Sequence, residues 1–182
     1  MKITLVTGNW AKVMQAKNFL EPLGFEIDNE KMDTIEIQSD FVEEVAKYSA
    51  KWASEKLKKN VMKVDTGIMI EALNGFPAAY THYVQDTIGI DGVLKLMENV
   101  SNRKAKFVQA LGFCEYGKEP MVFVSITNGT IAKESMGSYG WSWDKIFIPE
   151  GKDQTLACFE DEERLKLWND TGYMQLAKYL KK

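Results

Sequence analysis

The stretch 61-VMKVDTG-67 organises this chain. Its first four residues lean apolar and predict a short β-strand, and the pair Thr66-Gly67 predicts the end of that strand. Asp65 is therefore expected at the carboxyl end of a strand, which is where ligands bind in an open α/β sheet. A carboxylate there can hold a metal ion or activate water, and it can equally close a turn. The stretch alone leaves these alternatives open.

The composition narrows the class of protein. A chain of 182 residues suits one domain, and 45% hydrophobic with 27% charged residues is ordinary for a soluble globular protein. The net charge of −3 and the pI near 5.4 argue against non-specific binding to nucleic acid or to an anionic membrane. No apolar run approaches the ~20 residues of a membrane span, and residues 1–6 do not resemble a signal peptide, so we expect a cytoplasmic protein.

Cysteine and histidine are too rare for several kinds of site. The chain has two cysteines, Cys114 and Cys158, and one histidine, His82. These numbers imply no disulfide framework and no multi-cysteine zinc site, and they disfavour histidine metal clusters and Ser-His-Asp chemistry. Catalysis is therefore expected to use carboxylates, lysines and a metal ion, and His82 is expected to be structural or solvent-facing.

The N-terminal segment has the pattern of an anion-binding turn. Residues 3–6 predict a strand, residues 7–9 (Thr-Gly-Asn) a turn, and residues 10–20 a helix with Lys12 in its first turn. Backbone N–H groups at such a helix start can face an anion. The loop 7-TGNWAK-12 lacks the glycine spacing and the Lys-Ser/Thr pair of a Walker A sequence. A plain βα turn with a solvated lysine is the alternative.

A second candidate carboxylate precedes the central stretch. Residues 34–38 alternate and predict an extended segment in which Glu36 faces away from its isoleucine neighbours. Asp40 then predicts an N-cap, with Glu43 completing a capping box, for a helix that runs to about residue 59. Glu36 is thus expected at the mouth of the sheet, or simply as an exposed strand carboxylate.

The remaining segments predict an α/β fold. The expected elements are a strand at 25–27, a turn at 74–77, two helical pieces within 80–100 broken near 89–92 with Asp91 as a cap, a hairpin of 105–116 and 121–126, a turn or bulge at 128–129, and a helical tail at 160–182 interrupted near 169–172.

The loop 137-GSYGWSWDK-145 is rich in aromatic residues. Trp141 and Trp143 are costly to leave in water, so they either plug the edge of a core or form a slot for a flat ligand such as a base. Composition does not separate the plug from the slot.

Taken in order, these motifs resemble the inosine triphosphate pyrophosphatase family, house-cleaning enzymes that cut deaminated purine nucleoside triphosphates to the monophosphate and pyrophosphate. The resemblance covers roughly residues 2–157. The motifs that carry it are 7-TGNWAK-12, the segment around Glu36, 64-VDTGIMIEALNGFPAAY-80 and 140-GWSWDKIFIPEGKDQTLA-157. Each is modest, and their order and spacing give the resemblance its weight.

The resemblance implies a fold and an assembly. It implies an α/β fold with an elongated mixed β-sheet flanked by helices, and two lobes with a nucleotide cleft between them. Residues 1–182 would form a single domain, usually found as a homodimer. From the charge and the lack of a long apolar run, we expect no nucleic-acid and no membrane partner.

The resemblance also implies an active site with Mg²⁺ as cofactor. Glu36 and Asp65 would bind the metal, Asp65 and Lys12 would be catalytic, and water would attack the α-phosphorus. The substrate-binding residues would be Thr7, Gly8, Asn9, Lys12 and Thr66 in the two loops, Trp141, Trp143 and Asp144 beside the base, and Lys166.

The chain departs from the family pattern at three places. Val64 replaces the first acid of a pair, Ser142 and Lys145 replace a glycine and a proline of the aromatic loop, and residues 170–172 (Asp-Thr-Gly) stand where the family has Ser-His-Arg. These departures leave the base preference open. The alternatives are a catalytically weak or inactive nucleotide-binding relative with altered base specificity, and an interaction protein that uses the tryptophan-rich loop as a partner surface.

Overall fold

The structure is a computed structural model that describes residues 1–182 and divides into two compact units. The first unit comprises Met1–Thr66, Gln109–Ser125 and Asp170–Lys182, and the second comprises Gly67–Val108 and Ile126–Asn169. The strands form a seven-stranded mixed sheet in the order β2-β1-β3-β5-β6-β7, with β4 paired to β3. The predicted α/β class with a mixed sheet and flanking helices is confirmed, whereas the single domain stays a prediction.

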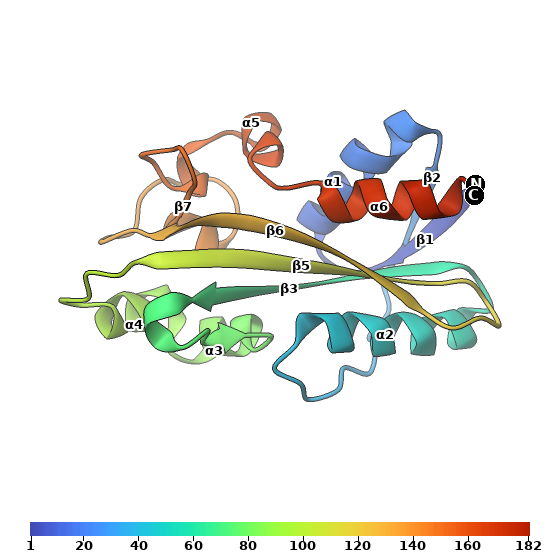
Figure 1. Ribbon diagram of the computed structural model, residues 1–182, viewed down its shortest axis with the longest axis horizontal. Helices are drawn as coiled ribbons and strands as arrows, with labels where there is room; N and C mark the ends of the chain where they lie inside the picture. Colours follow the sequence, from blue (N-terminus) through green and yellow to red (C-terminus); the bar gives the residue numbers. More distant parts are fainter. The chain divides into compact units, whose positions relative to one another are not determined.

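Figure 1 labels the helices and every strand except β4. The strands are β1 (Lys2–Val6), β2 (Glu26–Glu30), β3 (Val61–Ile70), β4 (Pro77–Ala78), β5 (Lys104–Cys114), β6 (Met121–Ile131) and β7 (Phe147–Pro149). The helices are α1 (Trp10–Leu20), α2 (Val42–Leu57), α3 (Thr81–Thr87), α4 (Gly89–Leu96), α5 (Asp161–Lys166) and α6 (Thr171–Leu180). None of these helices combines the length and the apolar character that crossing a bilayer requires.

In the first unit, β1 pairs in parallel with β2 on one side and with β3 on the other. Helices α1 and α6 cover one face of these strands and α2 covers the opposite face (Figure 1). Both α1 and α6 present apolar residues at helical spacing to one shared core, including Val13 and Leu20 from α1 and Tyr173 and Leu176 from α6. The α2 face buries Ala53 against Val61.

Helix α2 lies unusually close to the sheet because β5 has a glycine beneath it. A Cβ atom added at Gly112 would stand 2.2 Å from the carbonyl oxygen of Ala46 and 3.1 Å from the side chain of Ala50. This close approach fixes the position of α2, and therefore of the loop that leads into it.

The second unit has its own hydrophobic core. Strands β3, β5 and β7 contribute Ile68, Phe107 and Phe147, and helices α3 and α4 contribute Val84 and Val93. Phe107 and Phe147 are in ring contact, with their centroids 4.7 Å apart.

The prediction that β3 ends at Thr66-Gly67 is wrong. The strand continues to Ile70, so Asp65 lies in its interior rather than at its carboxyl end. Gly67 and Ile68 are buried, and β4 pairs with Ile68 and Met69, so packing and a second partner carry the strand through the glycine. Tertiary contacts here override a local signal for a turn.

Other predicted boundaries also change. Residues 34–38 form no strand, because Ile35 is exposed and no neighbouring strand pairs with the segment. Helix α2 begins without a side-chain cap at Phe41 rather than at Asp40, and Asp91 lies inside the first turn of α4. Gly129 lies within β6, where it pairs with Pro149 of β7.

Several predicted elements are confirmed. Helix α1 spans the predicted residues, the hairpin is formed by β5 and β6, and the helical tail is interrupted between α5 and α6. His82 is exposed and lies 3.5 Å from Asp86, which agrees with a solvent-facing role.

Replacing Gly112 by alanine should destabilise the protein by about 2 kcal/mol or more, because the new Cβ meets backbone atoms that cannot rotate away. Chemical denaturation measures this change. Lys104→Ala, at the exposed first residue of the same strand, is the control and should change stability by less than about 0.5 kcal/mol. Equal stability of Gly112→Ala and wild type would contradict the close packing of α2 on β5.

Candidate active site

The loop between β1 and α1 is held by its own side chains. The Asn9 side-chain oxygen accepts the backbone N–H groups of Ala11 (2.9 Å) and Lys12 (3.4 Å), which makes Asn9 the N-cap of α1. The Thr7 hydroxyl oxygen accepts the N–H of Asn9 at 3.0 Å. The acceptor atoms of both residues are thus used within the loop, and their hydroxyl and amide hydrogens remain for a ligand.

Packing does not explain Gly8. It is exposed, and an added Cβ would meet only the aliphatic carbons of Lys31, at 3.5 Å or more. Its predicted contact with a substrate therefore stays a prediction.

Lys12 hydrogen-bonds a backbone carbonyl of β3 that lies beyond the last residue paired with β1. Its ammonium donates to the carbonyl oxygen of Val64 at 2.7 Å. The Thr4 N–H donates to the carbonyl of Asn60, and by strand alternation the carbonyl of Val64 faces the same side. The register between β1 and β3 ends at Met62, so the lysine takes up the next free carbonyl on that side.

One face of β3 packs in the hydrophobic core, and the other face carries the charged residues of the candidate site. Met62 and Val64 are buried in the core beneath α1 and α6. Lys63 and Asp65 project from the other face, because successive side chains of a strand alternate. Val64 stands where the family pattern has the first acid of a pair, and its side chain therefore points away from the face that carries Asp65.

Four charged groups meet in the first unit. Lys12 and Lys63 both interact electrostatically with Asp65 and Glu36. The Lys63 ammonium donates to the hydroxyl of Thr34 at 2.8 Å and lies 3.8 Å from Glu36 Oε1. The structure thus brings together the predicted residues Lys12, Glu36 and Asp65, and adds Lys63, which the sequence prediction missed. Its position two residues before Asp65, on the same strand face, was the available signal.

Burial disfavours the ionised forms of Asp65 and Lys12. It raises the pKa of Asp65; the Lys12 ammonium opposes that shift and Glu36 adds to it. Burial also lowers the pKa of Lys12, against the attraction of Asp65 and Glu36. A further cation at this site would stabilise the ionised form of Asp65.

The donor atoms fit a magnesium ion that shares its ligands with a substrate. Asp65 Oδ2 is buried without a hydrogen-bond partner, as is the hydroxyl of Thr66. Mg²⁺ is commonly bound by one or two carboxylates together with phosphate oxygens. The protein offers no cluster of three or more His, Cys, Asp or Glu side chains for a metal. The residues therefore suit an ion that is held jointly by protein carboxylates and phosphate oxygens, rather than one enclosed by protein ligands alone.

The aromatic loop belongs to the second unit. Trp143 is fully buried in the core of that unit, whereas Trp141 is half-buried against it. Of the two alternatives for this loop, a core plug or a slot for a flat ligand, Trp143 fits the core plug. A base contact by Trp143 would require its ring to leave the core, and it stays a prediction, as does stacking on Trp141.

Asp144 is buried beside an arginine that the sequence prediction missed. Its Oδ2 accepts a hydrogen bond from the backbone N–H of Trp141 at 2.8 Å and lies 3.6 Å from Nε of Arg164 in α5. Burial raises the pKa of Asp144 to about 6, and the Trp141 N–H and Arg164 oppose this shift. Arg164 also pairs with Asp161 at 2.7 Å, a spacing that reads in sequence as an ordinary helix-surface pair. Lys166 on the same helix is exposed.

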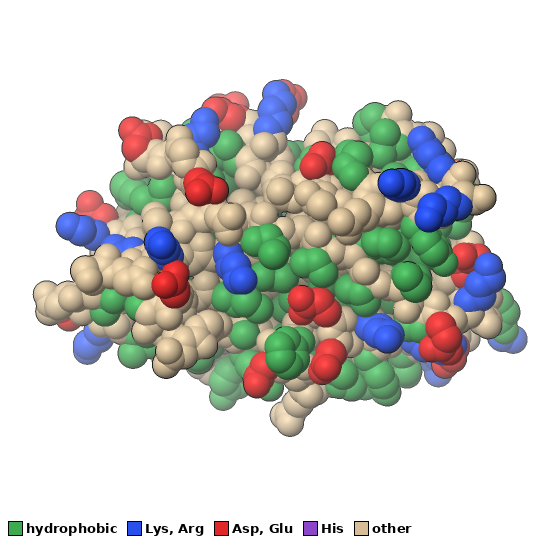
Figure 2. All heavy atoms as spheres, viewed as in Figure 1, with side chains coloured by type: hydrophobic (Ala, Val, Ile, Leu, Met, Phe, Trp, Pro, Cys, Tyr) green, Lys and Arg blue, Asp and Glu red, His purple; other side chains and the backbone are tan.

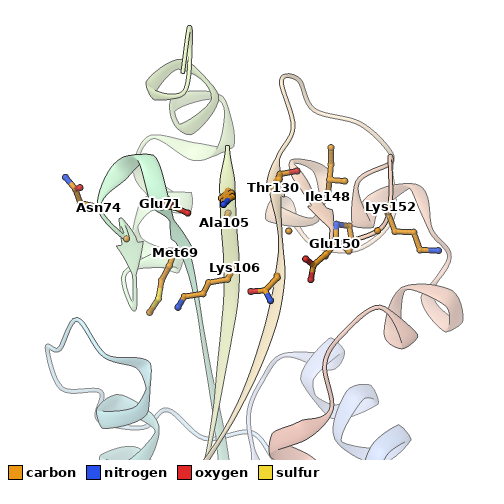
Figure 3. A pocket seen from close by; sticks show the side chains of 15 residues that line it. Met69, Glu71, Asn74, Ala105, Lys106, Thr130, Ile148, Glu150 and Lys152 are labelled. Atoms are coloured by element: carbon orange, nitrogen blue, oxygen red, sulfur yellow. The ribbon is translucent and has the colours of Figure 1, made fainter. Parts of the chain in front are cut away.

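A cavity of about 850 Å³ lies in the second unit (Figure 3). Strands β5 and β6 and the segment after β7 line it, with Lys106, Thr130 and Glu150 among its side chains. None of the predicted site residues lines it, and its lysine and glutamate side chains are exposed. We therefore centre the candidate site on Asp65, where buried polar atoms lack partners.

The protein surface shows no dominant sign of charge on the face drawn in Figure 2. Acidic and basic side chains are interspersed with apolar ones there.

Comparison with known proteins places the chain among relatives of similar length. A model of the Ham1 family matches residues 3–168. A dITP/XTP pyrophosphatase of Methanopyrus kandleri is 45% identical over 175 residues, covering 96% of this chain and 93% of the relative. A dITP/XTP pyrophosphatase of Thermococcus kodakarensis is 41% identical, covering 92% and 90%.

Solved structures share the fold. A HAM1 protein from Coxiella burnetii has a TM-score of 0.86 at 23% identity, covering all of this chain and 98% of the other. A nucleoside-triphosphatase / dITP/XTP pyrophosphatase from Mycobacterium abscessus has a TM-score of 0.75 at 22% identity, covering 97% and 98%.

The raised pKa of Asp144 should appear in the pH dependence of stability. Its pKa lies above the value of 3.8 for the free group, so the native state binds the proton more tightly than the unfolded chain. The stability of wild type relative to Asp144→Asn should therefore fall, by on the order of 1–3 kcal/mol, as pH rises from about 4 to about 6. Chemical denaturation at several pH values measures this difference. Asp153→Asn, an exposed aspartate of the same unit, serves as control, and a flat difference for Asp144→Asn would contradict the assignment.

Proposed function

The chain belongs to the Ham1 family, and on that premise we propose that it hydrolyses nucleoside and deoxynucleoside triphosphates to the monophosphate and pyrophosphate. Deaminated purine nucleotides such as inosine and xanthosine triphosphate are the proposed substrates. The names of the relatives from Methanopyrus kandleri and Thermococcus kodakarensis support this choice. The observation that carries the proposal is the buried, unpartnered Asp65 carboxylate oxygen in a cluster with Lys12 and Glu36.

The loop before α1 supplies the groups for the phosphates. The Thr7 hydroxyl and the Asn9 amide retain hydrogens that the protein does not use, and the Lys12 ammonium lies within the same segment. Donors fixed in advance stabilise developing negative charge without reorganising during the reaction. The side-chain cap at Asn9 is what fixes them here.

Mg²⁺ is the proposed cofactor, held by Glu36 and Asp65 together with phosphate oxygens. When bound, it would neutralise part of the triphosphate charge and polarise the phosphate under attack. The partnerless oxygen of Asp65 and the exposed carboxylate of Glu36 support this assignment.

Asp65 is the proposed general base. Its carboxylate would accept a proton from a water molecule as that water attacks the α-phosphorus, and the bond from this phosphorus to the bridging oxygen would break to release pyrophosphate. Lys12 has two roles in this scheme: it favours the ionised form of Asp65, opposing the effect of burial on its pKa, and it stabilises negative charge on the phosphates.

A nucleotide-binding relative with weak hydrolysis is the second candidate. The absence of a third carboxylate from the cluster of Asp65 and Glu36 favours it. Fewer anionic ligands lower the affinity of a site for its metal.

We also propose a homodimer located in the cytoplasm. The exposed aromatic side chains Phe76, Tyr80 and Tyr83, on and just before α3, support a contact surface with a second copy. Both cysteines are unpaired, which suits a reducing compartment.

Asp65→Asn should lower metal-dependent pyrophosphate release by at least about 100-fold, because the amide cannot accept the proton and is a poorer metal ligand. Steady-state kinetics with Mg²⁺, and with EDTA in its place, measures this loss. Asp28→Asn, a half-buried aspartate of β2 whose only salt bridge is to the exposed Lys2, is the matched control and should keep wild-type rates. Full release by Asp65→Asn would sink the mechanism.

A screen of the common and deaminated nucleoside triphosphates separates the two candidate functions. The enzyme reading expects Mg²⁺-dependent pyrophosphate release, fastest with inosine or xanthosine nucleotides. Release from none of them, combined with a rise in melting temperature on adding nucleotide, would instead support the weakly hydrolysing relative, because a ligand bound only to the native state stabilises it.

A further inference from the structure

Lys63 has no part in the proposed mechanism, yet it lies among the groups that carry it. Its side chain is only 12% exposed, although it is a lysine on a strand. It projects from the same face of β3 as Asp65 and interacts electrostatically with Lys12, Glu36 and Asp65. Two lysines are thus held close to the carboxylates of Asp65 and Glu36, of which Glu36 is exposed.

The hydrogen bonds of Lys63 leave its ammonium incompletely satisfied. One N–H is donated to the Thr34 hydroxyl at 2.8 Å, whereas Glu36 Oε1 at 3.8 Å is within ion-pair but not hydrogen-bond distance. An ammonium has three donors, so the protein leaves capacity for a further acceptor. The Thr34 contact fixes the direction of the side chain without neutralising its charge.

Glu36 is a partner that Lys63 can lose. It lies in the irregular segment before α2, and its side chain is 59% exposed. Glu36 is also a proposed metal ligand, and a divalent cation would attract its carboxylate more strongly than a single ammonium does. Lys63 would then face the phosphates with its charge unpaired.

We propose that Lys63 is a second phosphate-binding residue of the active site, which pairs with Glu36 in the free protein and exchanges Glu36 for phosphate oxygens when polyphosphate binds. A divalent cation on Glu36 would favour this exchange without being required for it. This inference rests on the proposed function. It assigns the strand face of Lys63 and Asp65 to the polyphosphate chain, and it gives the free protein an internal cation where the metal later binds.

The test compares two ions of opposite charge, each added alone. Inorganic tripolyphosphate in EDTA reports on the anion site, and Mn²⁺ without phosphate reports on the metal site, both by titration calorimetry. In Lys63→Met, the Kd for tripolyphosphate should rise about tenfold, because a charge-assisted hydrogen bond is lost. The Kd for Mn²⁺ should fall several-fold, because a positive charge beside Glu36 has been removed.

Two further variants sharpen the result. Lys63→Arg keeps the charge and should restore most of the tripolyphosphate affinity. Lys59→Met removes a lysine that pairs with Glu30 at 3.1 Å elsewhere in the first unit, and it should change neither affinity.

Each outcome has one reading. Opposite shifts of the two affinities in Lys63→Met support the inference, since damage to the fold would weaken both. Unchanged tripolyphosphate affinity, or a loss of both affinities together, overturns it while leaving the proposed function intact. A wild-type protein that binds neither tripolyphosphate nor any nucleoside triphosphate overturns the proposed function as well.

Discussion

The hydrogen bond from the Lys12 ammonium to the Val64 carbonyl is the constraint on which the candidate site depends. The register of β1 with β3 ends before Val64, and an unpaired carbonyl in a half-buried setting is costly. A side chain from the first turn of α1 meets that need, which ties the helix start to the strand that carries Asp65. Farther along α1, Gln15 exchanges two amide hydrogen bonds with Gln109 of β5, at 2.8 and 3.2 Å, and fixes the helix a second time.

The charged cluster around that contact is a poor way to gain stability. Taking ionised groups out of water costs several kcal/mol each, and well-packed apolar residues often serve stability as well or better. Here burial shifts the pKa values of both Lys12 and Asp65 toward their neutral forms, and a carboxylate oxygen has no donor at all. Shifted pKa values and an unpaired buried carboxylate oxygen are typical of sites that bind a charged ligand.

The sequence predicted the parts of this molecule that depend on local signals. The β1-turn-α1 unit and the hairpin of β5 and β6 follow from residues adjacent in the chain. The continuation of β3 through Gly67 does not, because it depends on β4 and on the core around Ile68. For the same reason Lys12, Glu36 and Asp65 were named without their geometry, and Lys63 and Arg164 were missed because only the fold gives them their partners.

The alternation of β3 has a consequence for how this protein can change over time. Met62 and Val64 belong to the core, and Lys63 and Asp65 belong to the charged cluster, although all four are consecutive in the chain. Selection for folding and selection for chemistry therefore act on separate residues of one strand. The charged positions can be exchanged for new ligand preferences while the apolar positions preserve the scaffold, so divergence of activity need not erode the fold.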